Sequence, residues 1–562
     1  MESIDALEWD VPSDTTISRT AEKRPVQDVA ADLSLAPDDI EPFGAHAAKL
    51  THESLRRLSS QRQDGRLILV TAMTPTPRGE GKTVTTIGLG GALQAIGERS
   101  LVAIREPSLG PIFGFKGGAT GGGYAQVVPM ENINLQFTGD FPAITAAHNL
   151  VAAMLDNRVH RDDSFAVEEI VWPRTLDVND RTLRNVVVGR GGSVNGVERE
   201  SSFVITAASE LMAVVGMATD LEDLERRVAR VIVAYDSEGE PVTIGDLEAT
   251  GAVVTLLRNA LRPNLVQTLD GTPAFVHGGP FANIAHGTNT VLADQVGLSL
   301  ADYVVTEAGF GSDLGAEKFF DIVSRQGVTP DAVVLVATVR ALKHHGSDGA
   351  SVDGPDVEAV RAGFPNLDHH IESIRAFGLE PVVAINRFQD DTEAELATVL
   401  EHCRAVGCEA AVFEGYYHGA EGGTALARLV RDAADVGAPD FEPLYDLETP
   451  LEAKIETVAT RVYGADGVEF TDEAERDLER LRRHGFDDLS VCLSKVPSSL
   501  SDDSNQLGVP ADWTLTVREL YPAAGPGFVV ALTGNVLTMP GLPKTPSATE
   551  LTVDEDGNVD GL

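Results

Sequence analysis

A lysine and a threonine follow a short glycine-rich loop early in the chain, in a pattern typical of phosphate binding. The loop comes after an apolar, β-branched run, Leu67 to Thr71, that predicts a buried strand. An apolar helical pattern then runs from Lys82 to Ile96, and Gly97 ends it. Backbone N–H groups at such a loop and helix start point toward an anion. Lys82 would reach the outer phosphates of a nucleotide triphosphate, and the Thr83 hydroxyl would contact its Mg²⁺.

The loop departs from the usual phosphate-binding pattern at one position. The pattern G-x-x-x-x-G-K-[ST] has a glycine where this chain has Thr76, so the loop sequence is TPRGEGKT. The alternative is a glycine-rich hairpin followed by an ordinary helix. The order of strand, loop and helix favours the phosphate site, because the motif requires that context. We therefore predict that the nucleotide is bound by Thr76, Pro77, Arg78, Gly79, Glu80, Gly81, Lys82 and Thr83.

Arg105 and Glu106 come directly after a second apolar run, Leu101 to Ile104. We expect this run to be a strand next to the strand that precedes the loop. In open α/β sheets the ligand lies at the carboxyl ends of the strands. An arginine there can bind a carboxylate or a phosphate through two parallel hydrogen bonds. The alternative is a surface ion pair between the two side chains.

Three later apolar runs also end in polar side chains. The runs are Tyr303 to Thr306, Ala332 to Thr338 and Val382 to Ile385, and the residues that follow them include Glu307, Asp313, Glu317, Lys318, Arg340, Lys343, Asn386 and Arg387. Buried strands of this kind are typical of a parallel sheet whose site lies along one edge. We therefore predict an α/β fold with a P-loop NTPase-like core on a mostly parallel sheet, together with smaller α/β domains.

Three further glycine-rich segments each leave two interpretations open. Residues 105–149 contain too many glycines for a regular element, so we expect a backbone that wraps around a ligand rather than a floppy surface loop. His277 and His286, in the segment 264–289, lack the spacing of a helical metal pair. We expect them either to face a pocket or to be hydrogen-bonded structural histidines. In residues 413–423, two tyrosines precede a glycine-rich turn, where such rings stack on a flat heterocycle or simply pack.

The composition limits the possible partners. Acidic residues (86) exceed basic ones (44), which gives a formal net charge of −42. Such a surface repels nucleic acid and anionic membrane, and no apolar run approaches a membrane span. The three cysteines are too few for a disulfide framework and lack zinc-site spacing. We expect a soluble cytoplasmic protein, and the acid-rich, lysine-poor composition indicates a halophilic source.

Many segments of the chain resemble the formate–tetrahydrofolate ligase (formyltetrahydrofolate synthetase) family, in the family's order and over nearly the whole chain. They are TPRGEGKT, REPSLGP, FKGGATGGGYAQVVPMENINLQFTGD, NLVQTLDGTPAFVHGGPFANIAHG, DYVVTEAGFGSDLGAEKFFD, ATVRALKHHG, VAINRF, YGADGVEF and TMPGLPKTP. The missing first glycine of the loop is also a feature of that family. The resemblance implies that ATP, formate and tetrahydrofolate yield ADP, phosphate and 10-formyltetrahydrofolate through formyl phosphate. It also implies a homotetramer activated by a monovalent cation, K⁺ or NH₄⁺.

The resemblance also assigns roles to individual residues. Lys82 and Arg105 are expected to be catalytic, with Lys82 and Mg²⁺ neutralising the ATP phosphates and Arg105 binding formyl phosphate. Phe388 is expected to pack on the pterin ring of the folate. Tyr416 stands where the family usually has tryptophan and offers a flat but smaller face. His418 replaces a lysine that is usual in the family, which removes a fixed positive charge that a polyglutamate tail would meet.

At 562 residues, the chain is too long for one hydrophobic core. Before the first strand we expect one helical pattern from Val26 to Leu58. The predicted units are a mobile leader (1–25), a nucleotide-binding domain (26–365) with an internal α/β insertion (about 160–262), a folate-side α/β domain (366–485) and a C-terminal α/β domain (486–562).

Two other classes of protein share the strand–loop–helix unit. One is the P-loop ATPase that carries clusters or partitions cell components. Its loop normally begins with a second signature lysine, which is missing here before Lys82, and its chain is usually much shorter. The other is a non-catalytic scaffold gated by a nucleotide, which leaves the long glycine-rich segment and Arg105 unexplained. Phosphate release that requires both formate and folate separates the ligase from both.

Overall fold

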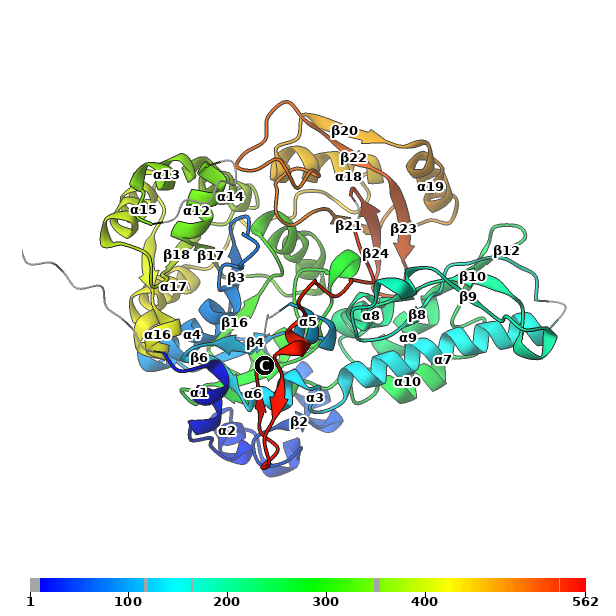
Figure 1. Ribbon diagram of the computed structural model, residues 1–562, viewed down its shortest axis with the longest axis horizontal. Coiled ribbons are helices and arrows are strands. Elements are labelled where there is room, and N and C mark those ends of the chain that lie inside the picture. The colour runs from blue at the N-terminus through cyan, green and yellow to red at the C-terminus, as the bar shows by residue number, and fades with distance from the viewer. Residues whose placement is uncertain (1–10, 116–119, 163–164, 348–353, 535) are drawn as a thin grey trace, which may run out of the picture.

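The computed structural model describes residues 11–115, 120–162, 165–347, 354–534 and 536–562, and one large mixed sheet runs through its centre (Figure 1). Over those residues the sheet has 12 strands in the order β1-β2-β14-β15-β4-β16-β3-β17-β18-β19, with β6 on β14 and β5 on β6. The strands are β1 (Ile40–Pro42), β2 (Ala48–Leu50), β3 (Arg66–Ala72), β4 (Ser100–Ile104), β5 (Gly121–Gly122), β6 (Ala125–Val128), β14 (Asn264–Thr268), β15 (Pro273–Val276), β16 (Tyr303–Glu307), β17 (Ala332–Ala337), β18 (Pro381–Asn386) and β19 (Ala410–Phe413).

The seven strands from β15 to β19 in this order are parallel, and the other pairs are antiparallel. The sequence therefore correctly predicted a mostly parallel sheet. The predicted strands at residues 67–71, 101–104, 303–306, 332–338 and 382–385 are confirmed, as is the helix that follows the loop, α4 (Lys82–Ala95). These runs are apolar on both faces because helices cover both sides of the sheet.

Helices on the two faces of β3 belong to different hydrophobic clusters. Ile68 and Val70 pack in one cluster with Leu89 of α4 and with α17 (Thr424–Val436). Leu67 and Leu69, on the opposite face, pack in the main core, which also contains α11 (Val291–Leu300). Alternate residues of a strand point to opposite faces, so a continuous apolar run is what a doubly covered strand requires.

The expectation that the strand before Arg105 lies next to the strand before the glycine-rich loop is wrong. β4 does not pair with β3, because β16 lies between them and pairs in parallel with both. Tyr303 of β16 lies opposite Arg66 on one side and Ser100 on the other. β16 comes about 200 residues later in the chain than β4, and its Val-rich run does not specify which apolar strands it will join.

The segment before β3 also differs from the expectation. The single helical pattern from Val26 to Leu58 is wrong, because Pro37 and Pro42 interrupt it and Ser34 has φ +60°. The structure instead has α2 (Val26–Asp32), a short 3₁₀ turn (Pro37–Asp39), the hairpin β1–β2 and α3 (His52–Ser59).

The described part of the expected mobile leader is packed against the sheet. α1 (Asp14–Thr20) buries Ile17, and the Asp14 carboxylate accepts a hydrogen bond of 2.8 Å from Gly123 N. Arg19 forms an ion pair of 2.9 Å with Glu131. Residues 11–25 therefore contribute to the folded structure, and residues 1–10 lie outside the described part of the chain.

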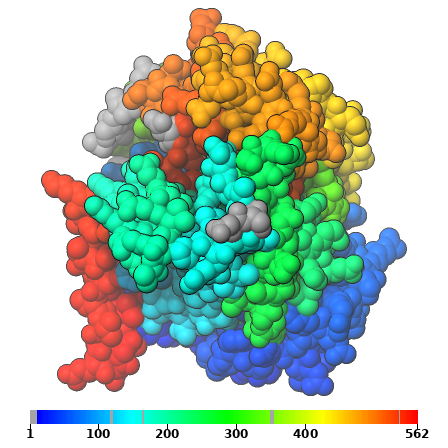
Figure 2. All heavy atoms as spheres, turned by 90° about the vertical axis from the view of Figure 1, so that its right-hand side faces the viewer, coloured from blue at the N-terminus to red at the C-terminus, as the bar shows by residue number. Residues whose placement is uncertain are grey.

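The expected insertion follows a long helix and forms one side of the molecule (Figure 2). Helices α7, α8, α9 and α10 pack against one another there. Its small sheets are β13-β12-β7, β10-β9 and β11-β8. The elements are α7 (Asp140–Arg161), β7 (Val167–Ile170), β8 (Arg174–Thr175), β9 (Val186–Val188), β10 (Arg199–Ser201), β11 (Phe203–Val204), α8 (Glu210–Met217), α9 (Leu221–Arg230), β12 (Ile232–Asp236), β13 (Pro241–Thr243) and α10 (Thr250–Leu257).

The C-terminal part of the chain extends from the top of Figure 1, where α18 to β24 lie, to the lower part of the view, where the red end of the chain lies. Its small sheets are β21-β24-β23, β20-β22 and β25-β26.

The α-helices and strands of the whole chain that have not yet been given bounds are α5 (Leu109–Gly114), α6 (Met130–Asn134), α12 (Val339–Gly346), α13 (Val357–Ala362), α14 (Phe364–Arg375), α15 (Glu393–Ala405), α16 (Gly415–His418), α18 (Leu451–Val458), β20 (Gly467–Phe470), α19 (Asp472–Arg483), β21 (Ser490–Ser494), β22 (Thr514–Val517), β23 (Glu519–Ala523), β24 (Phe528–Leu532), β25 (Thr552–Val553) and β26 (Val559–Asp560).

Strand pairing crosses two of the expected domain limits. β18 and β19 continue the central sheet beyond residue 365, and β20 pairs with β22 across residue 485. The division into domains stays a prediction. Within the described ranges, no helix combines the length and the hydropathy needed to cross a bilayer.

Candidate active site

The loop between β3 and α4 is a tight turn that contains two glycines with positive φ. Gly79 and Gly81 have φ +76° and +72°, in the left-handed region that favours glycine. A Cβ added to Gly81 would lie 2.2 Å from Nδ2 of Asn386. Gly81 is also the residue directly before α4, so the first N–H groups of the helix face outward from the loop.

The loop is held in shape by Glu80, whose side chain is buried. Its carboxylate accepts hydrogen bonds from Thr76 N (2.7 Å) and from Thr338 Oγ1 (2.5 Å). Its backbone oxygen accepts a hydrogen bond from Asn386 Nδ2 (2.9 Å). Thr338 follows β17 and Asn386 ends β18, so the neighbouring strands brace the loop from the same edge of the sheet. Pro77, Arg78 and Gly79, also predicted to bind nucleotide, remain exposed at the tip.

Thr83 contacts the last residue of β16, and Lys82 contacts the loop that follows this strand. Lys82 Nζ donates a hydrogen bond to the backbone oxygen of Phe310 (3.2 Å), and Thr83 Oγ1 donates to Glu307 Oε2 (2.9 Å). Burial lowers the pKa of Lys82 to about 8, the Glu307 carboxylate opposes this shift, and Arg105 adds to it. The insertion of β16 between β3 and β4 therefore gives the two predicted phosphate ligands their protein partners.

Arg105 and Glu106 point to opposite sides of the sheet edge, as successive residues of an extended chain do. Arg105 lies against Gly309, where an added Cβ would be 2.6 Å from its Nη1. Its Nε and Nη2 atoms are buried without a hydrogen-bond partner. Burial lowers the pKa of Arg105 against the attraction of Glu307. A buried guanidinium with unused donors requires an anion or a polar ligand.

Glu106 lies in a different buried cluster. It is 2% exposed, and burial raises its pKa well above the usual range, with a further contribution from Asp140. Asp140 itself forms a buried ion pair of 2.9 Å with Lys49. The alternative of a surface ion pair between Arg105 and Glu106 is therefore wrong.

The arrangement places two cationic side chains and one carboxylate at the carboxyl ends of three adjacent strands. Lys82 follows β3, Glu307 ends β16 and Arg105 follows β4. The charges of Lys82 and Arg105 both interact with that of Glu307. Such a site can hold a phosphoryl group between the two cations, while the hydroxyl of Thr83 and the carboxylate of Glu307 supply the oxygen ligands that Mg²⁺ prefers.

Binding of MgATP is expected to weaken as the pH rises through about 8. The ammonium form of Lys82 attracts phosphate, and its pKa of about 8 in the free protein means that this form is lost above that pH. The check is the dissociation constant of MgATP between pH 7.5 and 9.5, with Lys82→Arg as the control, because a guanidinium stays charged over this range. An identical loss in both proteins would show that another group is responsible.

The two predicted folate-binding residues follow adjacent parallel strands. Phe388 comes two residues after β18, and its ring is covered on one side by the guanidinium of Arg340, 4.2 Å from the ring centre. Tyr416 lies in α16 after β19, and its backbone oxygen accepts a hydrogen bond of 2.9 Å from Tyr124 N. A Cβ on Gly123 would lie 2.8 Å from the Tyr416 ring. Both rings are half-buried.

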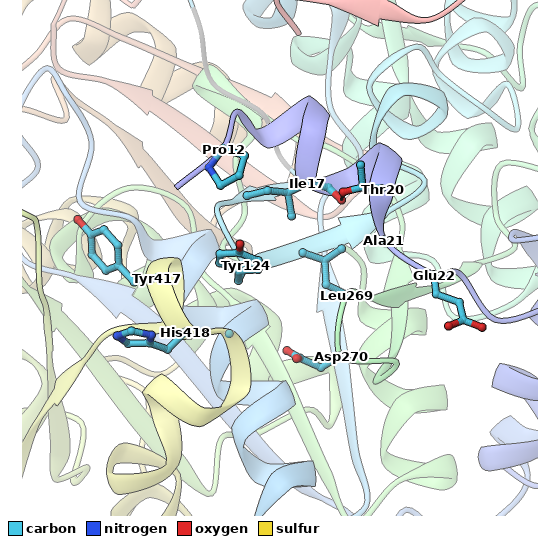
Figure 3. A pocket seen from close by; sticks show the side chains of 11 residues that line it. Pro12, Ile17, Thr20, Ala21, Glu22, Tyr124, Leu269, Asp270, Tyr417 and His418 are labelled. Carbon is cyan, nitrogen blue, oxygen red and sulfur yellow. Dashed lines mark hydrogen bonds between the residues drawn. The ribbon is translucent and has the colours of Figure 1, made fainter. Parts of the chain in front are cut away.

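A cavity of about 550 Å³ lies between α1 and the turn after α16 (Figure 3). Figure 3 shows Tyr417 and His418 on one side of this cavity and Ile17 and Thr20 on another. Asp270 and Glu22 also line it, and burial raises the pKa of Asp270. The two carboxyl groups make this cavity a poor match for a polyglutamate tail, which is negatively charged and would be attracted by the lysine that His418 replaces. Tyr416 is not among the residues that line it.

His277 and the described part of the first glycine-rich segment have structural explanations. His277 is fully buried, with Nδ1 2.7 Å from Thr290 Oγ1 and Nε2 2.8 Å from the Ala260 oxygen, so the structural alternative is confirmed for it. His286 is also fully buried, beside Gly216, but neither of its ring nitrogens has a hydrogen-bond partner within the described residues, so the hydrogen-bonded alternative is not confirmed for it. The described part of residues 105–149 contains α5, β5, β6, α6 and the start of α7, so the expectation of an irregular segment is wrong there. Residues 116–119 lie outside the description.

Sequence reasoning missed two contributors to the site. The backbone oxygen of Phe310, which contacts Lys82, carries no residue-type signal because every residue has one. His370, which contacts Thr74 at the start of the phosphate loop, lies in a helix nearly 300 residues away and follows another histidine without any motif. Local sequence patterns do not predict either contact, because both join residues that are more than 200 positions apart in the chain.

Comparisons with known proteins identify the family of the chain. Residues 12–562 match the family model described as formate–tetrahydrofolate ligase. A protein named formate–tetrahydrofolate ligase from Haloquadratum walsbyi is 54% identical over 98% of this chain and 97% of its own length. Another of that name from Haloarcula marismortui is 53% identical over 96% of this chain and 100% of its own length. The chain belongs to the formate–tetrahydrofolate ligase family.

Proposed function

We propose that this protein catalyses the ATP-dependent ligation of formate to tetrahydrofolate, giving 10-formyltetrahydrofolate, ADP and phosphate in one-carbon metabolism. The observation that carries the proposal is the meeting of Lys82 and Arg105 beside Glu307, in a chain that belongs to this family over nearly its whole length. The two relatives named above carry the name of this activity. The strand, glycine-rich loop and helix also support a P-loop NTPase-like core.

The chemistry requires activation of formate, which is a poor electrophile. Transfer of the γ-phosphoryl group to a formate oxygen would release ADP and form formyl phosphate. N10 of the folate would then attack the formyl carbon, the bond to the phosphate oxygen would break, and N10 would lose its proton. Lys82 neutralises the phosphates and Arg105 binds the oxygens of formyl phosphate through its free donors. No covalent intermediate with the protein is required.

The Mg²⁺ ion that accompanies ATP has suitable ligands at this site. Thr83 Oγ1 and Glu307 Oε2 are 2.9 Å apart, and both are the hard oxygen donors that Mg²⁺ prefers. Across the described residues, no group of three or more His, Cys, Asp or Glu side chains is arranged to bind a metal. This fits an ion held by one or two side chains together with the nucleotide phosphates, and the ion would supply charge neutralisation.

Phe388→Ala is expected to weaken tetrahydrofolate binding by about 1–3 kcal/mol, which is about 5- to 150-fold in Kd, if the ring stacks on the pterin. One face of the Phe388 ring already carries the Arg340 guanidinium, so only the other face is available to a ligand. The measurement is the Kd and KM for tetrahydrofolate, with Phe388→Tyr as the control that keeps the ring. An unchanged folate KM in the alanine variant would remove Phe388 from the folate site.

The test of the proposed function is ADP release from MgATP in high potassium chloride, with formate and tetrahydrofolate added separately and together. Release that requires both, together with a formylated folate product, is the expected result. Release that is indifferent to formate and folate would instead favour the ATPase alternative. Replacing KCl by NaCl or NH₄Cl at equal ionic strength tests whether the enzyme requires K⁺ or NH₄⁺.

We also propose that the enzyme works as a cytoplasmic homotetramer in a salt-rich cell. The net charge of −42 and the two relatives from halophiles support the salt requirement, because salt screens the repulsion between acidic subunits. Sedimentation at 3 M and at 0.1 M KCl measures both properties. A tetramer that persists unchanged in low salt would contradict the salt requirement, and a monomer in high salt would contradict the assembly.

A further inference from the structure

The residue that joins β3 to the phosphate loop is held by two buried histidines. The Thr74 N–H donates to His370 Nε2 (2.8 Å), and the Thr74 oxygen accepts from His345 Nε2 (3.0 Å). Pro75 and Pro77 come next in the chain and have no N–H to donate. The N–H of Thr74 is therefore the last hydrogen-bonded backbone N–H before the loop that holds the predicted phosphate ligands.

The hydrogen bonds of His370 define its tautomer. Nε2 accepts from Thr74 N, so it carries no proton, and Thr74 Oγ1 lies 2.9 Å from the same atom. Nδ1 therefore carries the proton and donates to Ser312 Oγ, 2.7 Å away. The ring is fully buried, and burial lowers its pKa to about 3 against the attraction of Asp313, so it stays neutral. One ring thus makes two different, directed contacts.

The second contact of His370 reaches the opposite wall of the candidate site. Ser312 lies two residues after Phe310, whose backbone oxygen accepts the hydrogen bond from Lys82 Nζ (3.2 Å). Phe310 has φ +60°, a conformation that a bulky side chain rarely adopts. A strained residue keeps its conformation only where its surroundings hold it. His370 is one of the groups that hold this loop, through Ser312.

A buried ion pair fixes the same loop from the C-terminal part of the chain. Lys495 Nζ lies 2.7 Å from Asp313 Oδ2, and both side chains are fully buried. Asn366, on the same helix as His370, donates to Thr74 Oγ1 (3.1 Å) and to the Gly508 oxygen (2.8 Å). The contacts around His370 are therefore continuous from the phosphate loop to the C-terminal strands.

We propose that His370 is a positioning residue for the MgATP site, which holds the start of the phosphate loop and the Phe310 loop at the separation that Lys82 requires. The inference rests on the proposed function. His370 itself contacts Thr74 on one side and Ser312 on the other, so it would act on Lys82 only through the two loops. A misplacement of about 1 Å at a reacting group reduces rates by about 100-fold, so an anchor between two walls of a site has a large effect on turnover.

The test compares His370→Leu and His370→Gln with the same substitutions at His369. His369 is the adjacent histidine, it donates to the Val462 oxygen (2.7 Å), and its ring is perpendicular to that of His370. We expect His370→Leu to lower kcat/KM for ATP by about 10- to 100-fold, while KM for tetrahydrofolate changes by less than about twofold. His370→Gln should lose less, because its side-chain oxygen can accept the Thr74 N–H. Thermal unfolding of all four variants is measured in parallel.

The inference is overturned if His370→Leu loses no more ATP efficiency than His369→Leu, or if ATP and folate parameters fall together. If His370→Leu does not fold, Ser312→Ala decides the question, because it removes one hydroxyl at the other end of the contact. That variant should lose about 2- to 10-fold in kcat/KM for ATP, and an unchanged value would overturn the proposal. The Kd of MgATP separates this inference from the proposed function. This Kd should be raised in His370→Leu even if ADP release by the wild-type protein does not depend on formate and folate.

Discussion

Lys82→Ala is expected to reduce formyltetrahydrofolate synthesis by at least about 100- to 1,000-fold, with the folded structure retained. The Lys82 ammonium is expected to lie next to the ATP phosphates, and its hydrogen bond to Phe310 O holds it in the candidate site. Little loss of stability is expected, because burial lowers the pKa of Lys82 and removing a partly desolvated charge relieves that penalty. The measurements are kcat, the Kd of MgATP and the unfolding temperature.

Lys23→Ala is a matched control for this change. The pKa of Lys23 is also lowered by burial, but it lies outside the candidate site and contacts the Ala21 oxygen. Normal turnover in Lys23→Ala and loss in Lys82→Ala would place the effect at the phosphate site. A collapse of the Lys82→Ala protein would show instead that Lys82 is part of the folding core.

Arg105→Ser is expected to lower kcat/KM for formate by about 100- to 1,000-fold and to change the Kd of MgATP much less. The guanidinium has two buried nitrogen atoms without partners and lies in a niche that Gly309 keeps open. Its free donors match the oxygens of formate or formyl phosphate. Arg105→Lys keeps the charge but loses the paired donors, so it should recover only part of the activity.

Arg99 provides the control for Arg105. It lies directly before β4, at the opposite end of the strand that Arg105 follows, and its exposed side chain lies 3.6 Å from Asp302. Arg99→Ser should leave the formate parameters unchanged, since exposed ion pairs contribute little. Equal effects of the two substitutions, or unchanged formate use by Arg105→Ser, would remove Arg105 from the site.

Local patterns predicted the parts of the site that depend on residue type and spacing. The apolar runs form strands, the glycine-rich loop lies between β3 and α4, and polar residues follow the strands, as the sequence predicted. Gly81 illustrates why this succeeds, because its φ of +72° and its contact with Asn386 both require a glycine. The expected helix from Val26 to Leu58 failed for an equally local reason, since prolines and a left-handed serine divide it.

By itself the sequence determined the family, the mostly parallel sheet, and Lys82 and Arg105 as the cations to test. Only the tertiary structure decided that β16 lies between β3 and β4, so that Glu307 meets both cations. It also brought His370 to the start of the phosphate loop. The physical reason is that hydrophobic periodicity encodes which residues are buried and in what element. The choice of partner among similar apolar strands, and the contacts of backbone oxygens, depend on the packing of the whole chain.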